Sequence, residues 1–253
     1  VLIVTLSMAL TPIGFWLLEH VLEPRWNKRD ERKFDSLEDM PEHEVIIAGF
    51  GRVGQIIARI LRVHRIQFVA LESSARQVDF VRRFGNQVFY GKLDNLALLE
   101  AAGASKAKLL VLAIDDVEES LRTAQLVRHH YPKLPVYARA RDRMHAYRLM
   151  DLGIDVVHRE TLGSSLEMAR DVLINIGFNK TSAELSVKRF REYDDQLMVR
   201  QQAIYQNEVA LVESAKQAMQ ELEGLFESDS RAAKKSSDST AEGKTAEGKE
   251  DTL

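Results

Sequence analysis

The sequence contains no cysteine among its 253 residues. This absence excludes a disulfide framework and any metal site built on thiolates. The seven histidines are scattered, and neither a carboxylate nor a second histidine recurs at ligand spacing, so we expect no metal site. Lys and Arg number 35 against 38 Asp and Glu. The resulting net charge of −3 gives no general affinity for nucleic acid.

Charged side chains are also scarce at the start of the chain, where Glu19 is the only Asp, Glu, Lys or Arg among residues 1–22. The length of this apolar run suits a helix that crosses a bilayer, which needs about 20 residues. A cluster of basic residues typical of a cytoplasmic flank follows directly: Arg25, Lys28, Arg29, Arg32 and Lys33. No basic region precedes the run, so we do not expect a signal peptide.

We therefore expect residues 1–22 to be the last transmembrane helix of a larger membrane protein, and residues 23–43 to be a charged cytoplasmic linker. The alternative is an amphipathic helix buried in a soluble protein, but such a helix would show more polar residues over six turns.

A glycine turn follows a short apolar strand that is predicted to begin at residue 44. In the pattern Gly-x-Gly-x-x-Gly, the first glycine permits a tight turn, the second lets the backbone approach a phosphate, and the third lets helix and strand pack. The helix predicted over 52–63 points free N–H groups and the positive end of its dipole at that anion. We expect nucleotide contacts from the whole turn: Gly49, Phe50, Gly51, Arg52, Val53 and Gly54.

A second apolar strand, predicted over 67–72, ends in Glu72. A Rossmann unit places an acid about 20 residues after its glycines, where the carboxylate binds a ribose hydroxyl. An acid at this place favours a free 2′-hydroxyl over a 2′-phosphate. Asp94 and Asp115 follow later predicted strands, and we include both in the expected nucleotide site.

Strands and helices are predicted to alternate through residues 44–158. Further strands are expected over 87–90, 109–114, 135–140 and 155–157, and further helices over 75–84, 96–102, 117–130 and 144–152. Repeated βα units of this kind predict an α/β fold with a Rossmann-like, doubly wound parallel sheet. Its ligands would bind at the carboxyl ends of the strands.

Residues 159–227 are predicted to be helical, with one helix over 161–176 and a long helical stretch over 183–227. Apolar residues recur every seven positions in the second stretch, which fits either docking on the chain's own domain or pairing with another helix. Residues 228–253 are polar and contain Thr-Ala-Glu-Gly-Lys twice in succession, so a disordered tail is expected.

Several segments of the chain resemble one family. Residues 43–55, 84–91, 138–142 and 158–161 are similar to the C-terminal domain of the glutathione-gated potassium efflux antiporters of bacteria, and residues 7–12 resemble the end of the last span of the cation:proton antiporter superfamily. The resemblance implies a regulatory, non-enzymatic domain of the type that regulates K⁺ conductance. It would lie at the bacterial inner membrane, with residues after about 23 in the cytoplasm.

The resemblance also implies ligands and partners. AMP or NAD(H) would occupy the Rossmann crevice, glutathione would hold the transporter closed, and glutathione adducts of electrophiles would open it. The chain would form a homodimer, control exchange of potassium ion for proton by its own membrane antiporter domain, and bind a flavodoxin-like quinone oxidoreductase as an ancillary subunit.

Glutathione carries two carboxylates, which forked guanidinium groups hold well. The expected glutathione contacts are Arg52, Arg139, Arg141, Arg148 and Arg159. The alternative for each arginine is an ion pair within the chain, with an acid such as Asp115 or Glu160.

Two other function classes share the Rossmann signature. A nicotinamide-dependent oxidoreductase would need a substrate domain that supplies an acid or base, but no histidine follows residue 158. A nucleotide-gated monovalent cation transporter or channel subunit of related type remains open, although such a channel module would usually add a β-rich subdomain, and none is predicted here.

Overall fold

The structure is a computed structural model that describes residues 10–12, 43–85 and 87–225. Apart from residues 10–12 and 43, the predicted transmembrane helix over 1–22 and the linker over 23–43 lie outside the described residues, as does the tail over 228–253. Among the helices that are described, none has both the length and the apolar character needed to cross a bilayer.

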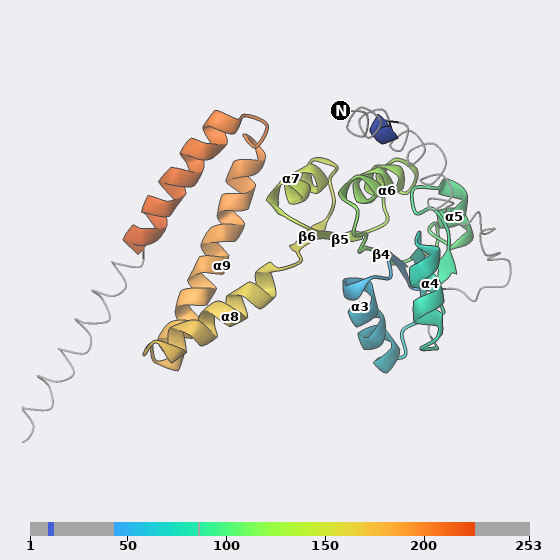
Figure 1. Ribbon diagram of the computed structural model, residues 1–253, viewed down its shortest axis with the longest axis horizontal. Coiled ribbons are helices and arrows are strands. Elements are labelled where there is room, and N and C mark those ends of the chain that lie inside the picture. The colour runs from blue at the N-terminus through green and yellow to red at the C-terminus, as the bar shows by residue number, and fades with distance from the viewer. Residues whose placement is uncertain (1–9, 13–42, 86, 226–253) are drawn as a thin grey trace, which may run out of the picture.

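Six parallel strands form the centre of the molecule (Figure 1). They are β1 (Val45–Ala48), β2 (Phe68–Glu72), β3 (Phe89–Tyr90), β4 (Leu109–Leu112), β5 (Val136–Ala140) and β6 (Val156–Arg159). The strands pair in the order β3-β2-β1-β4-β5-β6, which confirms the predicted Rossmann-like, doubly wound sheet. The order reverses between β1 and β4, and this switch point is where such sheets bind their ligands.

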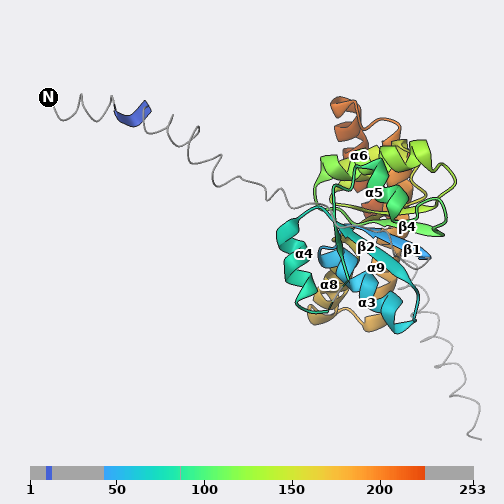
Figure 2. The same cartoon turned by 90° about the vertical axis from the view of Figure 1, so that its right-hand side faces the viewer.

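Helices cover both faces of the sheet. The helices α3 (Arg52–Val63) and α4 (Ala75–Arg82) lie on one face, and α5 (Leu96–Ala101), α6 (Val117–His130) and α7 (Arg143–Asp151) lie on the other (Figures 1 and 2). Helices α3 and α6 have the predicted bounds. Strand β3 keeps only two residues of the predicted strand over 87–90, at the edge of the sheet beside β2.

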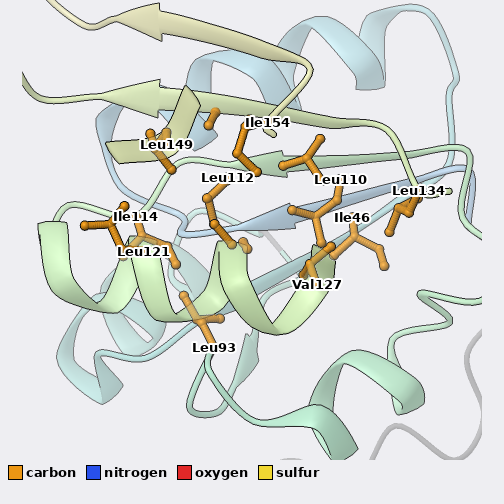
Figure 3. Packing of buried hydrophobic residues seen from close by; sticks show 14 of the residues in the cluster. Ile46, Leu93, Leu110, Leu112, Ile114, Leu121, Val127, Leu134, Leu149 and Ile154 are labelled. Atoms are coloured by element: carbon orange, nitrogen blue, oxygen red, sulfur yellow. The ribbon is translucent and has the colours of Figure 1, made fainter. Parts of the chain in front are cut away.

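The core consists of two apolar layers, because successive residues of a strand point to opposite faces. In β1, Ile46 faces α5–α7 and Ile47 faces α3 and α4, and both are fully buried. Figure 3 shows the larger layer, in which Leu121 and Val127 of α6 pack against strand residues such as Leu112. Burial on both faces explains why the strands read as continuous apolar runs.

Two helices and a further helical segment follow β6: α8 (Leu162–Asn175), α9 (Lys180–Gln202) and residues 208–225. The predicted long helix is present as α9, but the prediction of one helical stretch to residue 227 is wrong, because the chain turns at 203–207 and forms a hairpin (Figure 1). The Asn207 side chain accepts from the N–H of Ala210 and caps the returning helix. Tyr205, within the turn, stacks on Tyr147 of α7 with 5.2 Å between ring centroids.

Helix α9 docks on its own domain, as one of the two alternatives predicts, and it also contacts the returning helix. Met198 of α9 is buried in the larger core layer. On another side of the same helix, the Tyr193 hydroxyl donates to the Ala218 carbonyl of the returning helix at 2.9 Å.

The buried carboxylate of Asp194 holds α9 against the Rossmann domain. Asp194 is 2% exposed, and its two oxygens form ion pairs with Arg143 of α7 and Arg159 of β6. Arg143 also donates to Gln201 Oε1 at 3.3 Å, and the Tyr147 hydroxyl donates to the same oxygen at 2.9 Å. A charge removed from water needs such partners, because its desolvation is costly.

Replacing Asp194 by Ala is expected to lower the free energy of unfolding by about 3 kcal/mol, because two guanidinium groups lose their carboxylate at a mostly buried contact. Urea unfolding followed by circular dichroism measures this change. The matched control is Asp195→Ala at the next, exposed position of α9, where a change within about 0.5 kcal/mol is expected. Equal effects of the two substitutions would show that the Asp194 cluster does not hold the helix.

Candidate functional site

A pocket of about 850 Å³ opens at the carboxyl ends of β1, β2 and β4. Its walls come from the glycine turn, the first turns of α3, the residues after β2, the N-terminal part of α4, and the loop between β4 and α6. Among the predicted nucleotide contacts, the residues that line the pocket are Gly49, Gly51, Arg52, Glu72 and Asp115. Phe50, Val53, Gly54 and Asp94 do not line it.

The three glycines of the turn have different surroundings. Gly49 has a φ of +96°, and a Cβ added there would lie 2.7 Å from the carbonyl carbon of Ala113. A Cβ added at Gly54 would lie 2.2 Å from the Gly49 oxygen. A Cβ at Gly51 would meet no atom within 4 Å. The first and third glycines are therefore required by packing within the chain, whereas the second leaves open space in the pocket.

Gly51 is also the N-cap of α3, and no side chain caps this end of the helix. The first N–H groups of a helix have no partner within the helix, so an uncapped N-terminus in a pocket suits an anion. Arg52 follows at the first helical position with a side chain that is 80% exposed. This end of the pocket can therefore hold a phosphate.

Glu72 is buried at the end of β2 and ties two loops together. Its Oε2 accepts from the Phe50 N–H at 2.8 Å, and its Oε1 accepts from the Ser74 N–H at 2.9 Å. A carboxylate has about four lone-pair sites, so acceptor capacity remains for a ribose hydroxyl. The backbone contact of Phe50 explains how this residue shapes the turn without lining the pocket.

The two predicted aspartates have different positions. Asp94 forms an ion pair with Arg122 of α6 at 2.9 Å, and this pairing holds it outside the pocket wall. Asp115 lines the pocket and lies 2.5 Å from Nη2 of Arg139. The hydrogen bond from this guanidinium lowers the pKa of Asp115 below its ordinary value, so the carboxylate is ionised at neutral pH.

The five predicted glutathione arginines do not form one cluster. Arg52 and Arg139 share Glu160, at 3.2 Å from Nη2 of Arg52 and 2.9 Å from Nε of Arg139. Arg159, the residue before Glu160, pairs with Asp194. These three arginines, like Arg148 beside Glu118, therefore have acidic partners within the chain.

Arg148 of α7 shares no partner with the other four arginines. Its two Nη atoms donate to the carboxylate of Glu118 on α6 at 2.6 and 3.1 Å. Arg141 is exposed, and its backbone N–H donates to Nδ1 of His145 at 3.2 Å. The structure thus brings Arg52, Arg139 and Arg159 toward the Glu160 region and leaves Arg148 apart from that group.

Some residues of the pocket escaped the sequence analysis. Gln55 and Gln77 donate from their side chains to the Phe50 carbonyl at 3.1 and 3.3 Å and so support the glycine turn. Glu119 of α6 and Ser73 line the far part of the pocket. Gln77 lies three residues after the Ser74 cap, and this helical spacing could have indicated that its side chain points toward the glycine turn. No local pattern in the sequence indicates that the Ser73 and Glu119 side chains meet.

Known protein families match both parts of the chain. The TrkA-N domain matches residues 45–160, and the potassium efflux system KefB C-terminal domain matches residues 164–242. The structure of the Kef C-terminal domain of Shewanella denitrificans in AMP-bound form is 39% identical, with a TM-score of 0.57. The match covers 63% of this chain and 98% of that chain.

A second solved structure is the TrkA-N domain of the inner membrane protein YbaL from Escherichia coli, with 27% identity and a TM-score of 0.45 over 53% of this chain and 96% of that chain. The resemblance predicted from short segments of the sequence is confirmed, as is the expectation of a regulatory domain of potassium transport that is not an enzyme. The chain belongs to the family of Kef-type potassium efflux system C-terminal domains.

Proposed function

We propose that this chain is the regulatory, nucleotide-binding part of a potassium:proton antiporter at the bacterial inner membrane, joined to its own membrane antiporter domain. AMP or NAD(H) occupies the pocket at the glycine turn. The observation that carries the proposal is the open space beside Gly51 at the uncapped start of α3, with Glu72 held at the end of β2. The AMP-bound form of the Shewanella domain supports it.

In this arrangement, a phosphate binds at the N-terminus of α3, where free N–H groups and the helix dipole stabilise negative charge. The exposed Arg52 side chain adds a cation at the same end. The remaining acceptor sites of Glu72 bind ribose hydroxyls. The bound nucleotide then contacts the ends of β1 and β2 and the start of α3 together. The relative positions of these elements therefore depend on the ligand, as a regulatory domain requires.

Replacing Gly51 by Ala is expected to weaken AMP binding about tenfold or more without unfolding the chain, because the added methyl group meets no protein atom but stands where the phosphate approaches. Calorimetric titration of the purified 253-residue chain with AMP, and then with NADH, measures this effect. Gly163→Ala, at an equally open glycine of α8, is the matched control and should bind as the wild type does. A wild-type chain that binds neither nucleotide would overturn the proposed function.

We also propose that glutathione gates the transporter: glutathione holds it closed and its adducts with electrophiles open it. A gating ligand must bind the closed and open states of the transporter with different affinities. Compact glutathione and its bulky adducts can meet this requirement at one shared site. Arg52, Arg139, Arg141, Arg148 and Arg159 are the candidates to hold glutathione carboxylates. Arg52 is the best placed, since its side chain is exposed and pairs with Glu160 beside Arg139.

Arg52→Ala is expected to weaken glutathione binding about tenfold, as the loss of a charge-assisted hydrogen bond would. The matched control is Arg200→Ala, because Arg200 is a partly exposed arginine that pairs with Glu221 and is not among the candidates. Calorimetry in the presence of AMP, followed by competition with a bulky S-substituted glutathione, gives both affinities. Unchanged affinity in Arg52→Ala would remove Arg52 from the site, and no binding by the wild type would end the glutathione proposal.

We further propose a homodimer, in which the partner covers the outer face of α8. Met168, Val172 and Ile176 are 69%, 52% and 67% exposed along this helix, and a shallow groove runs beside them. A contiguous apolar face that is exposed on a helix marks an interaction surface. The flavodoxin-like quinone oxidoreductase remains a proposed partner that rests on the family alone.

Val172→Glu is expected to convert the dimer to a monomer, because it places a charge in the centre of the apolar face. Val209→Glu, at a valine that is 77% exposed on the returning helix, is the control and should remain dimeric. Sedimentation velocity distinguishes the two states. A monomeric wild type, or a dimer that persists in Val172→Glu, contradicts the placement of the interface on α8.

A further inference from the structure

The pocket continues beyond Glu72 into a recess between the end of β2 and the start of α6. Ser73 directly follows Glu72, and Glu119 lies in the first turn of α6. The Ser73 hydroxyl donates to Glu119 Oε2 at 3.2 Å, so the two side chains join the opposite walls of the recess. The Asp116 cap accepts from the Glu119 N–H at 2.7 Å and fixes the position of that residue.

The recess contains apolar side chains together with the Glu119 carboxylate, which can accept further hydrogen bonds. Leu93 and Ile114 line the same pocket and make part of its wall apolar. Within the described part of the chain, Ser73 is the hydrogen-bond partner of the Glu119 side chain, and no cation lies in ion-pair contact with it. Burial, together with the nearby Asp94, Glu72 and Asp116, raises the pKa of Glu119.

The order of the groups along the pocket places the base of a nucleotide in this recess. The N-terminus of α3 suits the phosphate and Glu72 suits the ribose, so the base lies past Glu72, beside Ser73 and Glu119. A half-buried carboxylate accepts hydrogen bonds readily but presents only lone pairs to an acceptor. The position of the base that directly faces Glu119 therefore has to carry a donor.

We propose that Glu119 selects adenine over 6-oxopurines in this pocket, with Ser73 as its positioning residue. The 6-amino group of adenine donates to the Glu119 carboxylate, whereas hypoxanthine and guanine place a carbonyl oxygen against it. This inference rests on the proposed nucleotide-binding function and names the base that the same site requires. A site built to pair with a donor rejects the analogue that lacks it, because a buried polar group is then left unpaired.

AMP and IMP provide the test, since they differ at the 6-position and share the ribose and phosphate. The wild-type 253-residue chain is expected to bind AMP at least about tenfold more tightly than IMP in calorimetric titrations. In Glu119→Gln, the amide oxygen still accepts from adenine, while the amide nitrogen can now donate to the 6-oxo group. IMP affinity is therefore expected to rise, and the preference to fall to about threefold or less.

A gain in IMP affinity is a result that structural damage does not produce. Glu118→Gln is the matched control, because Glu118 is the preceding residue, is exposed, pairs with Arg148 and lies outside the pocket wall. It makes the same change of charge on the same turn of α6 and should keep the wild-type preference. Melting temperatures of both variants confirm that they are folded.

The outcomes separate this inference from the function on which it rests. If the wild type binds AMP and IMP equally, or if Glu119→Gln leaves the preference unchanged, the role of Glu119 is overturned while nucleotide binding stands. If the wild type binds neither AMP nor IMP nor NADH, the proposed function itself fails.

Discussion

The contact between the Glu72 carboxylate and two backbone N–H groups gives the pocket its shape. One N–H belongs to Phe50 in the glycine turn and the other to Ser74 at the start of α4, so a single side chain joins the loops that follow β1 and β2. Parallel strands bring those loops to the same edge of the sheet, but they do not hold them together. Glu72 does so, and it still presents acceptor sites to a ligand.

Ion pairs continue from this pocket toward the C-terminal helices. Asp115 of the pocket wall pairs with Arg139, and Arg139 pairs with Glu160. The neighbouring residue, Arg159, pairs with Asp194 of α9. A ligand with carboxylates that bound among these arginines would compete with the carboxylates that hold α9 in place. The neighbouring residues Arg159 and Glu160 thus link the pocket wall to the contact that holds α9.

Local patterns predicted the elements whose boundaries have local causes. Helix α6 begins where the sequence indicates, because the Asp116 side chain accepts from the Glu119 N–H and caps the first turn. The stretch over 183–227 was mispredicted because a hairpin of two helices keeps the same apolar spacing as one straight helix. The turn at 203–207 contains Tyr205, which stacks on Tyr147 of α7. These two residues are too far apart in the chain for a local pattern to report their contact.

The sequence by itself determined the Rossmann-like sheet, the glycine turn and the acid at its second strand, because each depends on residue types at short, regular spacings. Only the tertiary structure decided which charges meet. It placed Asp94 on Arg122 outside the pocket and Glu119 on Ser73 inside it. It also separated Arg148 from the arginines near Glu160. These pairs join residues that are distant in the chain, so only the folding of the chain brings the two side chains of each pair into contact.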